Sequence, residues 1–95
     1  MQLEIITPET KVFEGEAEAV QFPGLDGSFQ VLSGHAPIIS ALASGDVKVD
    51  LTSNYDAANG SDKIVVEGSN KKVIRIAIKG GVVEMQNNKV IVLAE

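Results

Sequence analysis

Hydrophobic and polar residues alternate with a period of two along most of the chain, and no stretch has the period of a helix. The clearest case is Asp46–Leu51, where Val47, Val49 and Leu51 alternate with charged residues. Because successive side chains of a β-strand point to opposite faces of a sheet, this alternation predicts a strand with one buried face. Extended segments are expected at residues 2–6, 10–13, 16–22, 28–32, 38–42, 46–51, 63–67, 73–79, 82–85 and 90–93.

One segment, Glu16–Phe22, departs from regular alternation, since Ala17 and Ala19 lie on one face but Val20 and Phe22 on the other. We expect a β-bulge near Ala19, because one extra residue in a strand reverses which side chains face the core. Turns are predicted where Gly and Asn separate the extended segments, at Asn59–Gly60, Gly68–Lys72, Gly80–Gly81 and Asn87–Asn88.

Many short strands without helices between them are typical of an all-β sandwich or barrel. With 95 residues the chain is expected to form a single domain, residues 1–95. Its hydrophobic content of 44% and charged content of 22% are ordinary for a globular protein. Because it has no cysteine, neither a disulfide nor a cysteine-ligated zinc site is available.

The net charge of −5 and the pI near 4.7 argue against nucleic acid as a partner, since its phosphates would repel such a surface. The first residues have no basic start and no long apolar run, so we expect neither a signal peptide nor a membrane helix.

The segment Phe22–Ser40 is expected to form a rigid, exposed corner, because two turns enclose one short strand. Pro23–Gly24 and Asp26–Gly27 make up the first turn, and Ser33–Gly34 begins the second. The only histidine, His35, lies in the second turn, where its ring can hydrogen-bond to backbone groups. Corners of this kind commonly carry contact residues.

Catalysis is one alternative for this corner, with Ser33 as nucleophile, His35 as base and Asp26 as orienting acid. Such groups must converge in space from several parts of a fold, and a polar turn brings similar residues together without that purpose. A calcium loop at Tyr55–Asp62 fails, because Tyr55 and Ala57 stand where acids are required. The residues therefore favour a binding module over an enzyme or a metal protein.

A free-standing carbohydrate- or peptide-binding sandwich is the main alternative. Such modules usually present exposed aromatic side chains, whereas this chain has Tyr55 as its only polar aromatic residue and three Phe that we expect to face the core.

Two motifs resemble the N-terminal domain of the epsilon subunit of the F-type ATP synthase. The first is Gly24-Leu-Asp-Gly27 followed by Val31-Leu-Ser-Gly-His-Ala-Pro37, and the second is Ile78–Met85 followed by Val90–Ala94. The two motifs have the family's order and extend over most of the chain. The chain departs from the family pattern at Gln30, at Ser33 and in a long polar insertion, Thr52–Lys72, which we expect to extend a hairpin outward.

The resemblance implies an all-β fold, a flattened β-sandwich of two mainly antiparallel sheets with about ten short strands. It also implies a non-catalytic subunit of the central stalk that binds the gamma subunit and the c-ring, and that couples ion-driven rotation to ATP synthesis. Such a subunit is peripheral, lies at the cytoplasmic face of the cell membrane and contacts the membrane only through the c-ring.

Carried over by the motifs, the partner-binding residues fall into two groups. The resemblance implies that the first group, which forms the turn Gly24–Ser28, lies near the polar loops of the c-ring. It implies that the second group, which begins at His35, lies at or near the gamma and ring contacts. The two groups are Gly24, Leu25, Asp26, Gly27 and Ser28, and then His35, Ala36, Pro37, Ile39 and Ser40. Since neighbours in a strand face opposite sides, one residue of the Ile38–Ile39 pair is expected in the core.

Longer members of the family continue into a helical hairpin that regulates ATP hydrolysis and, in some, binds ATP. This sequence ends at Glu95, so we expect no cofactor and no nucleotide site in it. Melting curves recorded with and without ATP should therefore superimpose, because a ligand raises the melting temperature only when it binds the folded state. A clear rise with ATP would contradict this expectation.

Overall fold

The computed structural model describes residues 1–56 and 62–95, and these parts of the chain form nine β-strands and no helix. The predicted all-β class is confirmed. The strands are β1 (Gln2–Ile6), β2 (Lys11–Gly24), β3 (Gly27–Leu32), β4 (Ile38–Leu42), β5 (Gly45–Leu51), β6 (Ile64–Glu67), β7 (Asn70–Ile78), β8 (Gly81–Gln86) and β9 (Lys89–Ala94).

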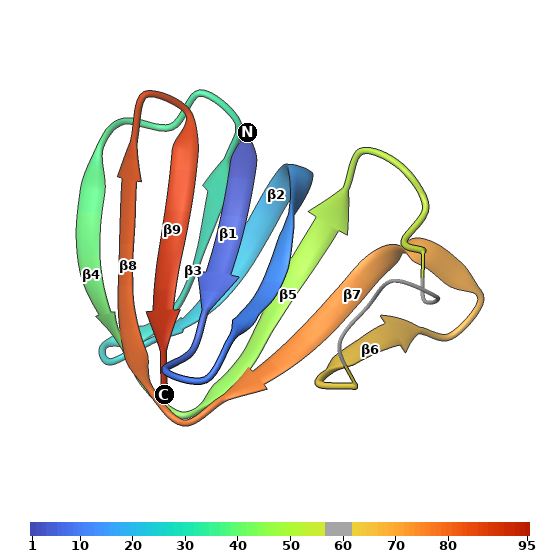
Figure 1. The fold of residues 1–95 in the computed structure, drawn as a ribbon. Coiled ribbons are helices and arrows are strands. Elements are labelled where there is room, and N and C mark those ends of the chain that lie inside the picture. The colour runs from blue at the N-terminus through green and yellow to red at the C-terminus, as the bar shows by residue number, and fades with distance from the viewer. Residues whose placement is uncertain (57–61) are drawn as a thin grey trace.

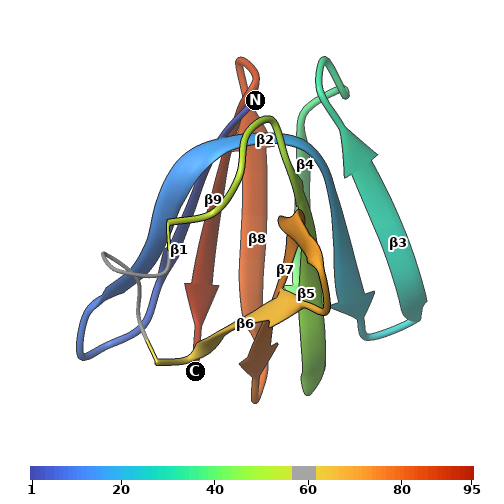
Figure 2. The same ribbon diagram turned by 90° about the vertical axis from the view of Figure 1, so that its right-hand side faces the viewer.

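The strands form two layers of a flattened sandwich (Figures 1 and 2). The β9 layer consists of β4, β8, β9, β1 and the first part of β2, and the β5 layer consists of β3, the second part of β2, β5, β7 and β6. Neighbouring strands pair antiparallel except β1 and β9, which are parallel. The predicted sandwich of two mainly antiparallel sheets is therefore confirmed.

Strand β2 joins the two layers. The alternation predicts two separate strands, residues 10–13 before Gly15 and residues 16–22 after it. In the structure Gly15 pairs with Leu3 of β1, and one strand continues through it. Residues Lys11–Glu16 pair with β1, whereas Ala17–Gly24 pair with β5 and β3. A glycine accepts the extended conformation of a strand, so its presence alone does not end one.

Two bulges bend β2. The register against β5 shifts between Ala17 and Ala19, which confirms the predicted bulge. A second shift, against β1 at Ile5 and Ile6, was not predicted. Each bulge places two consecutive residues in the core, first Val12 with Phe13 and then Ala19 with Val20. Because a bulge bends a strand and increases its twist, β2 can leave one layer and enter the other.

The core lies between the two layers and is built from the inward residues of each strand. The predicted inward residues Val47 and Val49 are fully buried, and Phe22 packs on Phe29 with ring centroids 5.5 Å apart. The largest fully buried side chains are Phe22, Leu3, Ile5, Ile74, Ile76, Met85, Val20, Val31, Val47, Val49, Val83 and Val90.

The polar insertion Thr52–Lys72 adds an edge strand to the β5 layer. Its described part returns to the sheet as β6, which pairs with β7 through a turn at Gly68–Ser69. This turn is shorter than the predicted Gly68–Lys72, because Asn70–Lys72 already belong to β7. Tyr55, Ile64 and Val66 pack against the core, so the insertion covers the core's edge as well as extending outward. The predicted Asn59–Gly60 turn lies outside the described residues.

The turn between β7 and β8 depends on Gly81. Its φ is +147°, and a Cβ built there would lie 2.2 Å from the carbonyl oxygen of Leu93 on β9. Gly68 also has a positive φ, of +52°, but a Cβ there would meet no atom within 4 Å.

We predict that Gly81→Ala destabilises the fold by roughly 2–4 kcal/mol, since it combines backbone strain with a steric clash. Gly68→Ala serves as the matched control and should cost about 1 kcal/mol, from the left-handed backbone alone. Urea denaturation followed by circular dichroism measures both free energies of unfolding. Equal losses in the two variants would show that the approach of Gly81 to β9 is not what requires a glycine.

An ion pair stands on the outer face of the β5 layer. The Arg75 Nε donates to Glu67 Oε2 over 2.5 Å, and Arg75 also lies beside Asp46. The hydrogen bond from Arg75 holds the pKa of the Glu67 carboxyl below its ordinary value.

Because the pKa of Glu67 is lower in the folded than in the unfolded chain, the ionised pair stabilises the fold above the ordinary glutamate pKa. That contribution is lost as the pH falls through the lowered value. An NMR titration of the Glu67 side-chain carbonyl should give a midpoint below that of an unperturbed glutamate, and Arg75→Gln should raise it. A midpoint that does not respond to Arg75→Gln would refute this cause.

Candidate partner-binding surfaces

Most of the residues predicted to contact partners lie at the two ends of the sandwich (Figure 1). Strand β3 leads from the turn Gly24–Ser28 at one end to the loop Ser33–Pro37 at the other. Strand β4 then runs back toward the turn. At roughly 3.4 Å per residue, a strand of this length holds the two groups about 15–20 Å apart. Ser40 lies with the turn, and Ile39 lies between the two ends on the outer side of β4.

The loop Ser33–Pro37 is exposed and is held by hydrogen bonds at its base. The His35 N–H donates to the Leu32 carbonyl over 3.0 Å, and His35 Nδ1 lies 2.7 Å from the Ala36 carbonyl oxygen. The ring thus bonds to the backbone of its own loop, as predicted. Asn88 Oδ1 accepts a hydrogen bond of 2.8 Å from the Gly34 N–H, a contact that nothing in the sequence pattern indicates.

The left-handed turn predicted at Asn87–Asn88 is confirmed, since φ is +54° at Asn87 and +59° at Asn88. Two left-handed residues in succession form the type of two-residue turn that suits the twist of a β-hairpin. The turn lies beside the Ser33–Pro37 loop at the same end of the molecule.

The geometry does not support a serine hydrolase. The Ser33 hydroxyl lies 3.4 Å from Asn88 Oδ1, and His35 Nδ1 is bonded within its own loop. Asp26 belongs to the turn at the opposite end of β3, so it cannot orient His35. The three groups do not converge as nucleophile, base and acid.

The turn Gly24–Ser28 is tightly packed at its base. A Cβ at Gly24 would lie 2.6 Å from the Gly27 carbonyl oxygen, so only glycine fits at that position. The Leu25 N–H donates to the Ala41 carbonyl on β4, and the Leu25 side chain is 66% exposed. The result is a fixed projection that presents Leu25 and Asp26 to solvent.

The outer face of the β9 layer carries an apolar surface that sequence reasoning identified only at Ile39. Cross-strand pairing aligns Ala41, Val82, Leu93 and Ile6 in one row, and places Ile39 and Ile91 in the neighbouring row. Ile39 is 73% exposed, Leu93 57% and Val82 43%, whereas Ile38 packs on the core. We call this set the apolar face, and its members are Ile6, Ile39, Ala41, Val82, Ile91 and Leu93.

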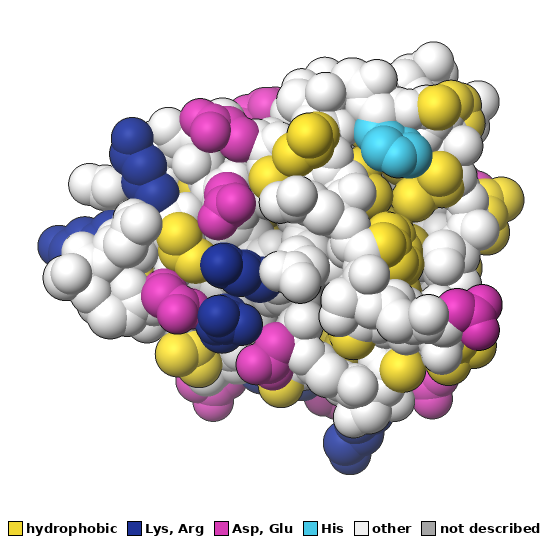
Figure 3. All heavy atoms as spheres, turned by 180° about the vertical axis from the view of Figure 1, so that it is seen from behind, with side chains coloured by type: hydrophobic (Ala, Val, Ile, Leu, Met, Phe, Trp, Pro, Cys, Tyr) yellow, Lys and Arg dark blue, Asp and Glu magenta, His cyan; other side chains and the backbone are white. Residues whose placement is uncertain are grey.

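The opposite face of the sandwich is different. Figure 3 shows acidic and basic side chains side by side over one part of it, and the histidine among hydrophobic side chains over another. The outer face of the β5 layer carries the Glu67–Arg75 pair, with Asp46 and Lys48 close by. The two outer faces of the sandwich thus differ in chemistry, and the apolar one stands out because outer faces of antiparallel sheets are commonly polar.

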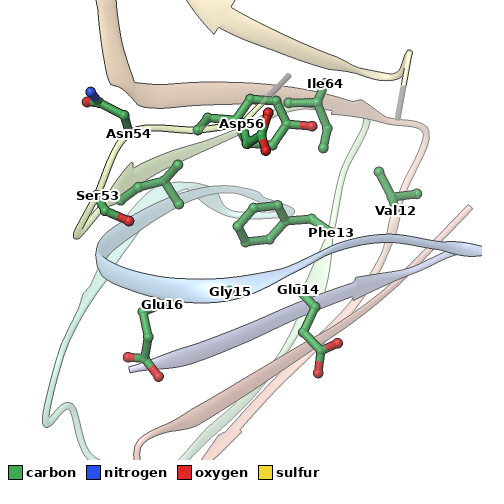
Figure 4. A pocket seen from close by; sticks show the side chains of 11 residues that line it. Val12, Phe13, Glu14, Gly15, Glu16, Ser53, Asn54, Asp56 and Ile64 are labelled. Atoms are coloured by element: carbon green, nitrogen blue, oxygen red, sulfur yellow. The ribbon is translucent and has the colours of Figure 1, made fainter. Parts of the chain in front are cut away.

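A cavity of about 280 Å³ lies between β2 and the segment after β5 (Figure 4). Phe13 points toward that segment, whereas Glu14 and Glu16 point to the other side of β2. The carboxylate of Glu14 lies 3.3 Å from Lys11 Nζ, so the acids do not converge on the cavity. Tyr55 is half-buried against Phe13, with ring centroids 6.5 Å apart, and provides no exposed platform for a sugar.

Within residues 1–56 and 62–95, no three His, Asp or Glu side chains gather in a way that could hold a metal ion. The same part of the chain contains no helix with the length and apolar character needed to cross a membrane.

Comparison with known proteins gives a consistent result. The family described as ATP synthase, Delta/Epsilon chain, beta-sandwich domain matches residues 1–68. The ATP synthase epsilon chain of Chlorobium limicola is 38% identical over 94 residues, which cover 99% of this chain and 88% of that protein. The epsilon chain of Salinibacter ruber is 35% identical over 96 residues, covering 100% of this chain and 58% of that protein.

The fold also matches a chain in the cryo-EM structure of the central stalk and c-ring of the Tetrahymena thermophila mitochondrial ATP synthase. The TM-score is 0.71 at 16% identity, over 99% of this chain and 62% of that one. At this identity the likeness shows the fold alone.

Proposed function

Because the chain belongs to the ATP synthase delta/epsilon chain family, we propose that it serves as the epsilon subunit of an F-type ATP synthase. In this role it is a non-catalytic part of the central stalk. It binds the gamma subunit and the c-ring, and residues 1–95 act as a single domain that couples ion-driven rotation to ATP synthesis.

The apolar face is the observation that carries this proposal. Large aliphatic side chains of three neighbouring strands are exposed together, with Ile39, Val82 and Leu93 between 43% and 73% accessible. A contiguous apolar surface of this kind is costly in water and is typical of a protein–protein contact. We assign it to the gamma subunit, together with the loop that leads into β4. Pro37 of this loop lies beside Ile39 and Glu84, and His35 and Ala36 lie at the same end of the molecule, with the histidine side chain visible from the opposite face (Figure 3).

Charge supports a specific partner for this face. Glu84 lies on β8 between Ile39 of β4 and Ile91 of β9, with an exposed side chain in the middle of apolar neighbours. Glu4, on the next strand, lies 3.5 Å from Lys89 Nζ. A gamma surface that offers apolar side chains around a lysine or arginine would complement this arrangement.

The second contact is assigned to the turn Gly24–Ser28, with Ser40 beside it. The turn projects from the end of the sandwich opposite to the His35 loop, so it can reach a different partner at the same time. Its exposed Asp26 and backbone groups suit the polar loops of a c-ring. A subunit held at both ends can transmit torque only if it is stiff, and β2, which belongs to both layers, resists sliding of one layer over the other.

We also place the subunit at the cytoplasmic face of the cell membrane. There it is a peripheral component, held at the membrane through the c-ring rather than by a lipid contact of its own.

Isothermal titration calorimetry with the purified gamma subunit tests the apolar face. We predict that Ile39→Asp weakens binding at least tenfold, because it places a charge within a desolvated contact. Val65→Asp is the matched control, since Val65 is 61% exposed but lies on edge strand β6 of the other layer, and it should leave binding unchanged.

Circular dichroism must show that both variants remain folded. Ile39→Asp binding with wild-type affinity would remove the apolar face from the gamma interface. Failure of the wild-type chain to bind gamma at all would refute the epsilon assignment itself.

A further inference from the structure

The Asn88 side chain connects two turns that are far apart in the sequence. Its Oδ1 accepts a hydrogen bond of 2.8 Å from the Gly34 N–H, across 54 residues, and lies 3.4 Å from the Ser33 hydroxyl oxygen. The Asn88 carbonyl oxygen accepts a further hydrogen bond, 3.1 Å long, from the Gln2 N–H. One residue thus joins the β8–β9 turn, the start of β1 and the loop between β3 and β4.

The loop is well anchored at its two ends and weakly held between them. The Ser33 N–H donates to the Glu18 carbonyl over 3.2 Å, and Ile38 pairs with Met85 of β8. Gly34, between these anchors, has a φ of +83°, and a Cβ built there would meet no atom within 4 Å. Packing therefore does not determine the conformation at Gly34. The bond from the His35 N–H to the Leu32 carbonyl closes the turn across Gly34 from within the loop, and the hydrogen bond to Asn88 restrains Gly34 from another part of the chain.

The turn itself does not explain why position 88 is an asparagine. Asn87 and Asn88 both have left-handed backbones, and glycine adopts that conformation with less strain than any other residue. An asparagine at position 88 adds an acceptor oxygen directed at the loop. The choice of residue follows from the contact rather than from the turn.

We propose that Asn88 is a positioning residue for gamma binding, which holds the Ser33–Pro37 loop in the conformation that presents His35, Ala36 and Pro37. This inference rests on the proposed function, since it concerns the same loop and the same partner. Asn88 acts before the encounter. A loop that is already ordered loses less conformational freedom on binding, and the apparent dissociation constant rises when the competent conformation is only partly populated.

Three variants separate this role from a general effect on stability. Asn88→Gly keeps the left-handed turn and removes the acceptor, whereas Asn88→Asp keeps an acceptor oxygen in a residue that still tolerates this backbone. Asn87→Gly is the matched control, because it changes the same turn in the same way and leaves the Asn88–Gly34 contact in place.

Two measurements on the whole chain are needed: the hydrogen-exchange rate of the Gly34 amide by NMR, and the affinity for the purified gamma subunit by calorimetry. We expect Asn88→Gly to raise the Gly34 exchange rate about fivefold, as the loss of one hydrogen bond implies, and to weaken gamma binding by a similar factor. Asn88→Asp and Asn87→Gly should retain both properties, and the melting temperature of Asn88→Gly should fall by no more than about 4–8 °C, the shift that the loss of one hydrogen bond implies.

Wild-type affinity in Asn88→Gly would overturn the positioning role while leaving the epsilon assignment intact. Equal losses of affinity in Asn88→Gly and Asn87→Gly would also overturn it, because the turn and not the acceptor would then be responsible. If the wild-type chain does not bind gamma, the proposed function fails and the gamma-binding role of Asn88 fails with it. The exchange rates still show in that case whether Asn88 orders the loop.

Discussion

The fold depends on one constraint: strand β2 belongs to both layers of the sandwich. Its first part pairs with β1 and its second part with β5 and β3, so a single backbone carries hydrogen bonds into each sheet. The bulges near Val12 and Glu18 allow this, because each bends the strand and brings two consecutive side chains into the core. At its far end, Gly24 also pairs with Leu42 of β4. The layers are thereby connected through their backbones as well as through the side chains packed between them.

This construction separates the surfaces that are available to partners. The apolar face belongs to the β9 layer, the mixed charged surface belongs to the β5 layer, and the two projecting turns lie at opposite ends of β3. A part that must be held by two partners at once benefits from this separation. Both partners can be bound at the same time because their contact surfaces do not overlap. A force applied by one partner reaches the other through hydrogen-bonded strands rather than through a flexible linker.

The local features of the chain could be predicted because they depend on neighbours in the sequence. Alternation in Asp46–Leu51 is sufficient to bury Val47 and Val49, and consecutive asparagines at 87 and 88 are sufficient for a left-handed turn. Even the bulge near Ala19 is visible as a change of parity along one segment. In contrast, Gly15 does not end β2, since an extended glycine and a turn glycine have the same appearance in a sequence.

In the candidate site, too, features that depend on neighbours in the sequence were predictable, and contacts between distant segments were not. The sequence by itself determined most of the strand pattern, the buried faces and the two glycine-containing turns, because side-chain period and backbone preference act over a few residues. Only the tertiary structure decided that Val82 and Leu93 share a surface with Ile39, and that Asn88 reaches the backbone of Gly34. Those contacts join residues dozens of positions apart, and they exist because β4, β8 and β9 pair side by side, which the period of one strand cannot specify.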